Sequence, residues 1–237
     1  MNLPDPRHFK NIVVLTGAGV SAESGLRTFR DNNGLWREYR VEELATPEAF
    51  TKNPKLVHAF YNSRRHTLLQ SAKANKAHFA LANFESTFEG NFLLVTQNVD
   101  NLHEQAGSKN PHHLHGELLR ARCGLCEHSV DIEGDLTCQS ICRHCGGIGA
   151  MRPDIVWFGE MPQQLELIEP ALSRCDLFVS IGTSGTVYPA AGFLRLAKTN
   201  GAITVELNLE ASANSGFFDY CSLGLASDVL PNFFHTA

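Results

Sequence analysis

The chain has 237 residues, of which 43% are hydrophobic, and a formal net charge of −5. This length accommodates one large domain, or one domain with a smaller insertion. The acidic balance argues against non-specific nucleic-acid binding, because neutralising phosphates requires a basic excess. Neither a stretch of about 18 apolar residues nor a secretion-signal layout is recognisable, so we expect a cytoplasmic protein without membrane contact.

The first predicted element is a buried strand over residues 12–15, followed by a glycine turn at residues 17–22. Gly-x-Gly-x-x-Ala after a strand is typical of the phosphate turn in dinucleotide-binding folds. There Gly17 would permit the turn, Gly19 would let the backbone approach a pyrophosphate, and Ala22 would allow close packing. We expect the phosphate to lie on free N–H groups at the start of a helix.

Residues 26–40 depart from the ordinary dinucleotide-binding pattern. They are polar and rich in turn residues, and they contain no predicted second strand. No acidic residue stands about 20 residues on, where a dehydrogenase holds the ribose. Such a loop indicates a lid or a binding loop. It argues against hydride transfer, although an NAD-dependent oxidoreductase stays open as an alternative.

Residues 41–82 are predicted to be helical, with starts at Thr46-Pro47-Glu48 and at Asn53-Pro54. Strands alternating with helical segments predict a parallel α/β sheet. The other buried strands are expected over residues 92–96, 177–181 and 202–207. In such sheets ligands bind at the carboxyl ends of the strands, so the turns that follow should line one crevice. These turns are residues 17–22, 97–100, 182–184 and 208–210.

Five of the seven cysteines lie between residues 123 and 145. Two Cys-x-x-Cys pairs separated by fifteen residues predict a closed four-thiolate zinc site with a structural role. Its ligands would be Cys123, Cys126, Cys142 and Cys145. Cys138 leaves an alternative, because Cys138-x-x-x-Cys142 is also an acceptable knuckle. We favour the Cys142 and Cys145 pair because two glycines follow it. Few basic residues interleave the knuckles, which argues against a nucleic-acid-binding zinc finger.

Candidate catalytic side chains follow the second buried strand. Asn98 and Asp100 stand at its end, where amides and carboxylates can orient a ribose or an attacking group. His112, His113 and His115 cluster in an expected loop before the zinc segment. Their position alone does not choose among them.

Taken together, these motifs resemble the sirtuin family. The resemblance extends over essentially the whole chain and rests on residues 17–30, 96–103, 113–116, 151–160, 182–184 and 208–210 and on both cysteine pairs. It implies a Rossmann-like domain with a smaller inserted domain. The large domain would comprise residues 1–36, 79–118 and 153–237. A helical module (37–78) and a zinc-binding module (119–152) would form the small domain.

Members of this family are NAD-dependent protein lysine deacylases, which consume NAD, release nicotinamide and transfer the acyl group to ADP-ribose. The resemblance implies that acyl-lysine proteins or peptides are the partners. It assigns His115 as the base that deprotonates a ribose hydroxyl, assisted by Asn98 and Asp100. A module that binds acyl-lysine or ADP-ribose without turnover is a further alternative, but it would need no base.

The resemblance also implies the binding residues. A cover over NAD, which excludes water, is expected from residues 23–36. Contacts with NAD are expected from Gly17, Ala18, Gly19, Ala22, Glu23, Thr28, Phe29, Arg30, Trp36, Gln97, Asn98, Val99, Asp100, Gly182, Thr183, Ser184, Asn208, Leu209, Glu210 and Ala226. The substrate peptide is expected beside a strand formed by Val156, Trp157, Phe158, Gly159 and Glu160.

One branch of the family carries a Tyr-x-x-Arg motif and removes acidic acyl groups such as succinyl. Tyr61 and Arg64 match it, and their i, i+3 spacing places both on one helix face. Arginine can hold a carboxylate through two parallel N–H bonds while the phenol adds a donor. The alternative is an exposed basic helix face with Tyr61 half-buried. We expect desuccinylation as well as deacetylation.

Overall fold

A computed structural model of the chain describes residues 3–26, 35–36, 39–40 and 43–235. Its main feature is a parallel six-stranded sheet with the order β11-β10-β9-β1-β4-β5. The strands are β1 (Asn11–Thr16), β4 (Asn91–Thr96), β5 (His112–His113), β9 (Leu177–Ile181), β10 (Ile203–Asn208) and β11 (Tyr220–Leu223). The predicted parallel α/β sheet and its four buried strands are confirmed.

The two edge strands differ from the sequence prediction. β5 replaces part of the expected histidine loop, and it pairs His112 with Val95 and His113 with Thr96. It is two residues long, so only its neighbour β4 identifies it as a strand. β11 alternates half-buried and exposed residues at the other edge. Neither strand has a hydrophobic run of its own that a sequence pattern can detect.

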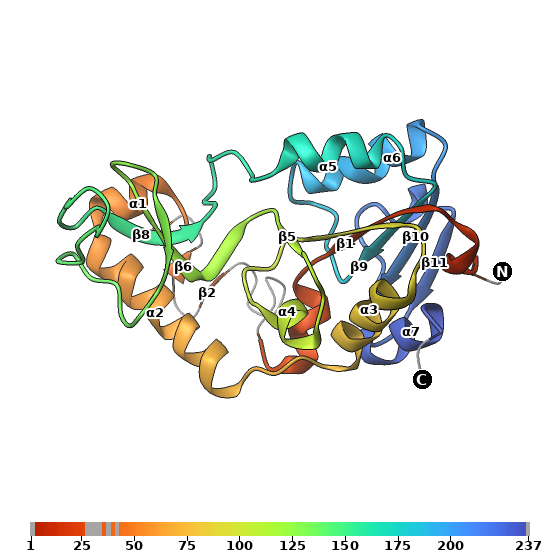
Figure 1. The fold of residues 1–237 in the computed structure, drawn as a ribbon, viewed down its shortest axis with the longest axis horizontal. Coiled ribbons are helices and arrows are strands. Elements are labelled where there is room, and N and C mark those ends of the chain that lie inside the picture. The colour runs from red at the N-terminus through yellow and green to blue at the C-terminus, as the bar shows by residue number, and fades with distance from the viewer. Residues whose placement is uncertain (1–2, 27–34, 37–38, 41–42, 236–237) are drawn as a thin grey trace.

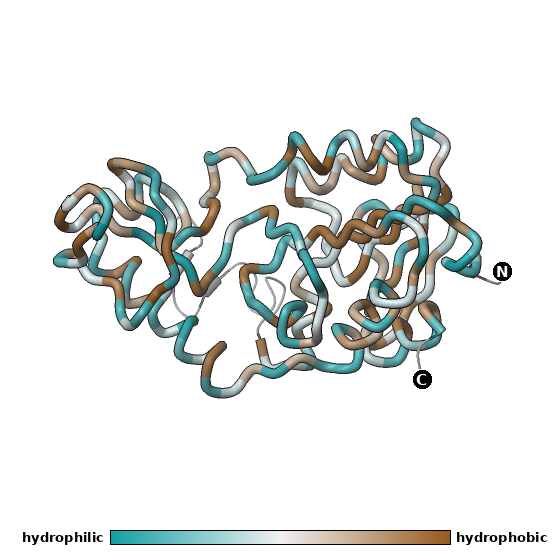
Figure 2. Tube along the Cα trace, in the orientation of Figure 1, coloured by the Kyte–Doolittle hydropathy of each residue, from teal (hydrophilic) through white to brown (hydrophobic). Residues whose placement is uncertain are grey.

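Helices cover both faces of this sheet and form the large lobe with it (Figure 1). Residues of β1 alternate between the faces, as strand geometry requires. Ile12 and Val14 pack with α3 (Lys76–Thr87) and α7 (Ala226–Phe233), whereas Val13 and Leu15 pack with α5 (Leu165–Leu172) and α6 (Phe193–Thr199). Figure 2 shows the hydrophobic colour concentrated along the central strands. The large core therefore consists of two apolar layers on one sheet.

The small lobe lies at the other end of the molecule (Figure 1). It contains α1 (Pro47–Lys52), α2 (Pro54–Ser71) and an antiparallel sheet with the order β7-β6-β8. Its strands are β6 (Gly116–Cys123), β7 (Ser129–Asp131) and β8 (Met151–Ile155). Thr46 and Asn53 accept hydrogen bonds from helical amides at the two predicted helix starts, which are therefore confirmed. The domain boundaries that we derived from the resemblance stay a prediction.

Shorter elements connect these parts. A 3₁₀ helix, η2 (Ala18–Ser24), follows β1 where we expected the start of a helix. β2 (Leu35–Trp36) and β3 (Tyr39–Arg40) form a small antiparallel hairpin in the segment expected to lack a strand. The remaining short helices are η1 (Pro6–His8), α4 (Leu102–Ala106), η4 (Ala190–Gly192) and η5 (Ser215–Phe217). Within the described ranges, no helix combines the length and apolar character that crossing a bilayer demands.

Candidate active site and zinc site

The glycine turn after β1 packs directly on the end of β9. Gly17 N–H donates to Ile181 O at 2.9 Å, and Gly19 N–H donates to Gly182 O at 2.8 Å. A Cβ atom on Gly17 would lie 2.8 Å from Gly182 O, and one on Gly19 would lie 2.7 Å from Gly182 Cα. The glycines are thus required for contact between two chain segments. The amides of Gly17 and Gly19 are thus occupied by Ile181 and Gly182, and the expected phosphate contact with N–H groups at the helix start stays a prediction.

A buried polar network lies behind this turn. Ser21 Oγ donates to Asp100 Oδ2 at 3.1 Å and accepts from Asn98 Nδ2 at 3.1 Å. His78 Nε2 lies 3.4 Å from the same hydroxyl, while His78 Nδ1 accepts from Asn75 N–H. The proton of a neutral His78 is therefore on Nε2, which donates to Ser21. Ser21 fixes Asn98 and Asp100 relative to each other.

Ser21 and His78 are functional candidates that the sequence analysis misses. Ser21 lies inside the glycine motif, so its position was a usable signal. His78 is detectable only as the third residue of α3, where it forms a capping box with Asn75. Burial raises the pKa of Asp100, partly opposed by its hydrogen bonds, and lowers the pKa of His78 to about 4. His78 is therefore a neutral donor at pH 7.

His113 and His115 differ in the hydrogen-bond partners of their ring nitrogens. His115 Nδ1 lies 3.1 Å from Gln97 O. A carbonyl only accepts, so Nδ1 carries the proton and Nε2 keeps its lone pair. Burial lowers the pKa of His115, which favours this neutral form. In His113, by contrast, both ring nitrogens have partners, Asn98 O at 2.9 Å and Glu104 Oε1 at 2.7 Å. The geometry favours His115 as a base.

Tyr61 and Arg64 lie inside the molecule rather than on an exposed helix face. Tyr61 is 1% exposed, and its hydroxyl accepts from Trp157 Nε1 at 3.0 Å. Arg64 is half-buried, with its guanidinium carbon 5.7 Å from the Phe60 ring centre. Burial lowers the pKa of Arg64, and the nearby Tyr61 and Asp100 oppose that effect. The alternative of an exposed basic face with a half-buried Tyr61 is therefore wrong.

Residues 156–160 do not form the expected strand. β8 ends at Ile155, which pairs with Gly116 at the very start of β6, so no ladder partner remains beyond it. Val156 N–H donates to His115 O and Phe158 N–H donates to Ala45 O, both at 2.9 Å. A turn at Phe158-Gly159 follows. The segment is an irregular connection beside His115.

Two of the expected peptide-binding residues have structural partners. Trp157 is 2% exposed and packs in the small-lobe core. Glu160 accepts from Arg152 Nη1 at 2.6 Å and from Trp157 N–H at 2.8 Å. Arg152 also lies over the Trp157 ring, with its Cζ atom 3.4 Å from the ring centre. These contacts stabilise the segment and leave the 48% exposed Phe158 as its accessible side chain.

The ends of β9 and β10 bring further candidates together. Asn208 Nδ2 donates to Thr183 O at 2.8 Å, and Ser184 Oγ lies 2.8 Å from Thr186 Oγ1. Leu209 is exposed just beyond β10. Because β1, β4, β9 and β10 are neighbours in a parallel sheet, all four predicted turns lie together at the carboxyl ends of the strands. Glu210 is also exposed there.

The other predicted NAD contacts are distributed around the glycine turn. Glu23 accepts from Ser227 N–H at 3.0 Å and from Ser227 Oγ at 2.6 Å, beside Ala226 at the start of α7. Ala18 and Ala22 lie in η2, and Val99 O accepts from Leu118 N–H. Trp36 belongs to β2. Thr28, Phe29 and Arg30, and with them most of the expected cover, lie outside the described residues.

Four cysteine sulfurs converge in the small lobe. The Sγ atoms of Cys123, Cys126, Cys142 and Cys145 lie within 4.8 Å of one another. The distances Cys123–Cys145 and Cys126–Cys142 are both 3.7 Å. A tetrahedral zinc with Zn–S bonds of about 2.3 Å places its sulfurs about 3.8 Å apart. The donor set thus fits a structural zinc ion. Cys138 is not part of this cluster, so the alternative knuckle is wrong.

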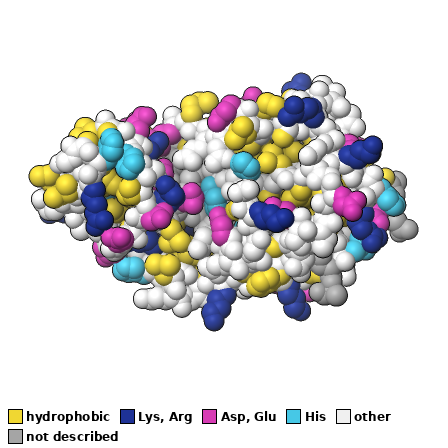
Figure 3. All heavy atoms as spheres, viewed as in Figure 1, with side chains coloured by type: hydrophobic (Ala, Val, Ile, Leu, Met, Phe, Trp, Pro, Cys, Tyr) yellow, Lys and Arg dark blue, Asp and Glu magenta, His cyan; other side chains and the backbone are white. Residues whose placement is uncertain are grey.

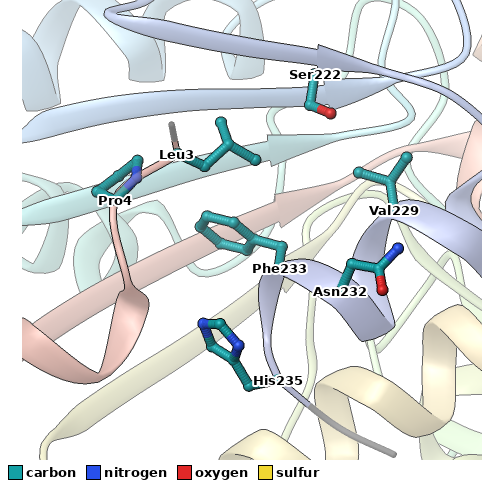
Figure 4. A pocket seen from close by; sticks show the side chains of 7 residues that line it. All are labelled: Leu3, Pro4, Ser222, Val229, Asn232, Phe233 and His235. Carbon is teal, nitrogen blue, oxygen red and sulfur yellow. The ribbon is translucent and has the colours of Figure 1, made fainter. Parts of the chain in front are cut away.

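A cavity of about 200 Å³ lies away from these groups (Figure 4). It is formed by the N-terminal segment, β11 and α7, and Leu3, Val229 and Phe233 supply its apolar lining. Ser222, Asn232 and His235 are its polar members. It contains none of the predicted site residues. We therefore place the candidate reaction site among the polar residues at the carboxyl ends of the strands of the large sheet.

Comparisons of the sequence and the structure with known proteins identify the family of this chain. The family model described as "Sir2 family" matches residues 17–189. An "NAD-dependent protein deacylase" of Pasteurella multocida is 56% identical over 223 residues, covering 94% of this chain and 95% of that protein. A protein of the same name from Bdellovibrio bacteriovorus is 56% identical over 230 residues, covering 97% of each.

A solved structure agrees with these relatives. It is described as a "Sir2 homolog-NAD complex", superimposes with a TM-score of 0.88 at 40% identity, and covers 97% of this chain and 90% of that one. The family model matches well over half of the chain, and the identities far exceed what fold similarity alone requires. The chain belongs to the Sir2 family, the sirtuins.

Proposed function

We propose that this protein is an NAD-dependent protein lysine deacylase. It removes acyl groups from lysine side chains of proteins or peptides, transfers them to ADP-ribose and releases nicotinamide. Membership of the Sir2 family and relatives named NAD-dependent protein deacylase support this activity. NAD is consumed as a co-substrate, and one zinc ion on the four cysteines has a structural role.

The observation that carries the proposal is the state of His115. Its Nδ1–H is held by Gln97 O, and its Nε2 lone pair is available as a general base. Burial keeps the ring neutral at neutral pH. His113 has no comparable free nitrogen, because Asn98 O contacts its Nδ1 and Glu104 Oε1 contacts its Nε2. We therefore assign to His115 the removal of a ribose hydroxyl proton.

NAD supplies the ribose carbon that accepts the acyl oxygen and the nicotinamide that leaves. We assign Asn98 and Asp100 to the binding of this part of NAD, and Ser21 orients both side chains. Such pre-orientation lowers the cost of arranging polar groups when the reaction begins. Thr183 and Ser184 at the end of β9, with Asn208 at the end of β10, are suited to the phosphates and the distal ribose.

We further propose that Tyr61 and Arg64 recognise an acidic acyl group such as succinyl. The Tyr61 hydroxyl accepts from Trp157 Nε1, so its own proton can point towards a carboxylate. Burial raises the pKa of Tyr61 to about 12, which keeps that proton in place. Arg64 provides a cationic fork on the same helix face. Deacetylation remains compatible with this site, since an acetyl group is smaller than a succinyl group.

The deciding experiment incubates the zinc-loaded protein with NAD and paired acetyl-lysine and succinyl-lysine peptides. Mass spectrometry of peptide and nucleotide products should show deacylated peptide, acyl-ADP-ribose and free nicotinamide in equal amounts. Formation of NADH instead would establish the oxidoreductase alternative. Peptide or ADP-ribose binding without any product would establish the binding-module alternative.

A cytoplasmic location and independence from nucleic acid are also proposed. On the face seen in Figure 3, acidic and basic side chains are interspersed, which gives no continuous basic surface there. This agrees with the net charge of −5. Unchanged deacylation in the presence of added DNA would support the proposed independence from nucleic acid.

A further inference from the structure

A buried hydrogen bond between Trp157 and Tyr61 joins two segments that lie far apart in the chain. Tyr61 belongs to α2, whereas Trp157 follows the end of β8. Trp157 Nε1 lies 3.0 Å from the Tyr61 hydroxyl oxygen, and the two residues are only 2% and 1% exposed. An indole N–H can only donate, so the phenol oxygen accepts. The phenol proton is therefore directed away from Trp157 and is available to a different acceptor.

Trp157 is held in place by contacts of both its backbone and its ring. Its backbone N–H donates to Glu160 Oε2 at 2.8 Å. The same oxygen accepts from Arg152 Nη2 at 2.8 Å, and the Arg152 guanidinium lies over the indole ring. Phe50 also contacts the indole, with the ring centres 5.3 Å apart. The direction of the indole N–H is thus set by the folded small lobe before a substrate binds.

Apolar packing alone does not require a tryptophan at this position. A phenylalanine ring would keep the contacts with Arg152 and Phe50 and much of the buried apolar area. The group that only the indole adds is its N–H, and this group is the one that contacts Tyr61. A donor whose direction is fixed in advance binds a charged ligand group at lower cost than one that must reorient. The tryptophan is therefore suited to orienting the hydroxyl.

We infer that Trp157 is a positioning residue for acyl selectivity, whose N–H fixes the Tyr61 hydroxyl as a donor towards an acidic acyl group. Arg152 and Glu160 support it by holding Trp157 in place. The inference rests on the proposed function, in which Tyr61 and Arg64 recognise a carboxylate. Trp157 acts through Tyr61 rather than by touching the substrate. An acetyl group presents no carboxylate to this hydroxyl, so deacetylation should not depend on the indole N–H.

The test compares kcat/KM for succinyl-lysine and acetyl-lysine peptides in Trp157→Phe. Loss of one neutral hydrogen bond should lower the ratio of desuccinylation to deacetylation by roughly 2–12-fold, with deacetylation retained. Phe50→Leu removes an aromatic contact with the same indole but leaves its N–H, so this matched control should keep the ratio. Tyr61→Phe/Trp157→Phe should show the same ratio as Tyr61→Phe alone, because both substitutions remove one and the same interaction.

A spectroscopic measurement serves where Trp157→Phe fails to fold. The chain has two tryptophans, so Trp36→Phe assigns the indole N–H resonance of Trp157. Without NAD, so that no turnover occurs, this resonance should shift further with the succinyl-lysine peptide than with the acetyl-lysine peptide. In Tyr61→Phe the difference between the two peptides should disappear.

Four results would overturn the inference: an unchanged ratio in Trp157→Phe, an equal fall in Phe50→Leu, additive effects in the double variant, or equal resonance shifts with both peptides. Failure of the proposed acyl recognition looks different, because Tyr61→Phe and Arg64→Met would then also leave the ratio unchanged. If those two variants lower the ratio and Trp157→Phe does not, only the role of Trp157 is refuted.

Discussion

Each of the two lobes of this protein is stabilised internally by a different set of interactions. The large lobe buries two continuous apolar layers against one parallel sheet. The small lobe has a short antiparallel sheet, a modest core and four clustered cysteines, supplemented by polar contacts. Arg65, for example, is buried and bridges α2 to Asp135. The comparison teaches that the large lobe relies on apolar burial, whereas the small lobe combines a smaller core with a cysteine cluster that fits a stabilising zinc ion.

Cys142→Ser should have the largest effect and should break this comparison most directly. Structural zinc contributes on the order of 10 kcal/mol to small zinc domains, so the small lobe should lose its ordered structure. Amide exchange should become fast in β6, β7 and β8 while β1 and β9 stay protected. Cys138→Ser, outside the cluster, is the control. Equal loss of protection in both lobes would show that they unfold as one unit.

His115→Asn tests the reacting edge of the large lobe. Loss of a general base should reduce kcat/KM for deacylation by about 10²–10⁴-fold, with the melting temperature nearly unchanged. His128→Asn, an exposed residue of the small lobe, provides a matched histidine control. A variant that keeps most of its turnover would contradict the assignment of the base to His115. Then His113 would be examined next.

Arg64→Met tests whether the small lobe selects the acyl group. A charge-assisted hydrogen bond to a carboxylate contributes about 1.5–3 kcal/mol, so desuccinylation should fall about 10–150-fold relative to deacetylation. Measuring kcat/KM for both peptides gives this ratio directly. Lys55→Met changes an exposed charge on the same helix and should leave the ratio unaltered. Parallel losses on both substrates would contradict the carboxylate interaction.

Acidification should reveal a smaller effect confined to the large lobe. His78 has a folded pKa of about 4 against an ordinary value of 6.5, so the unfolded chain binds the extra proton. Stability should therefore be lost as pH falls from about 6.5 towards 4, by about 2 kcal/mol at pH 5. Urea unfolding at pH 7 and pH 5 measures it. In His78→Asn this pH dependence should diminish, and an unchanged slope would assign it to other groups.

The pH profile of activity gives a further check. Burial lowers the pKa of His115 from its ordinary value of 6.5, so this base stays unprotonated to a lower pH than an exposed histidine does. The acidic limb of kcat/KM should therefore fall below the ordinary histidine pKa. A limb above 6.5 would indicate that a different group, such as His113 with its raised pKa, is being titrated.

Much of the fold could be predicted because its signals are local. The four central strands are apolar runs, and Thr46 and Asn53 are recognisable caps next to prolines. The zinc ligands follow from the spacing of two cysteine pairs. By contrast, β5 and the segment after Ile155 depend on where a neighbouring strand begins or ends. The residues of these two segments carry no sequence pattern that indicates where the neighbouring strand begins or ends.

The site shows the same division. By itself, the sequence determined the central strands, the cysteine pairs and the family resemblance, because each rests on residues close together in the chain. Only the tertiary structure decided that Cys138 stays outside the sulfur cluster and which histidine keeps a lone pair. It also decided that Gly17 and Gly19 serve contact with Gly182, and that Ser21 joins Asn98 to Asp100. These outcomes depend on atoms many residues apart, whose distances packing alone sets.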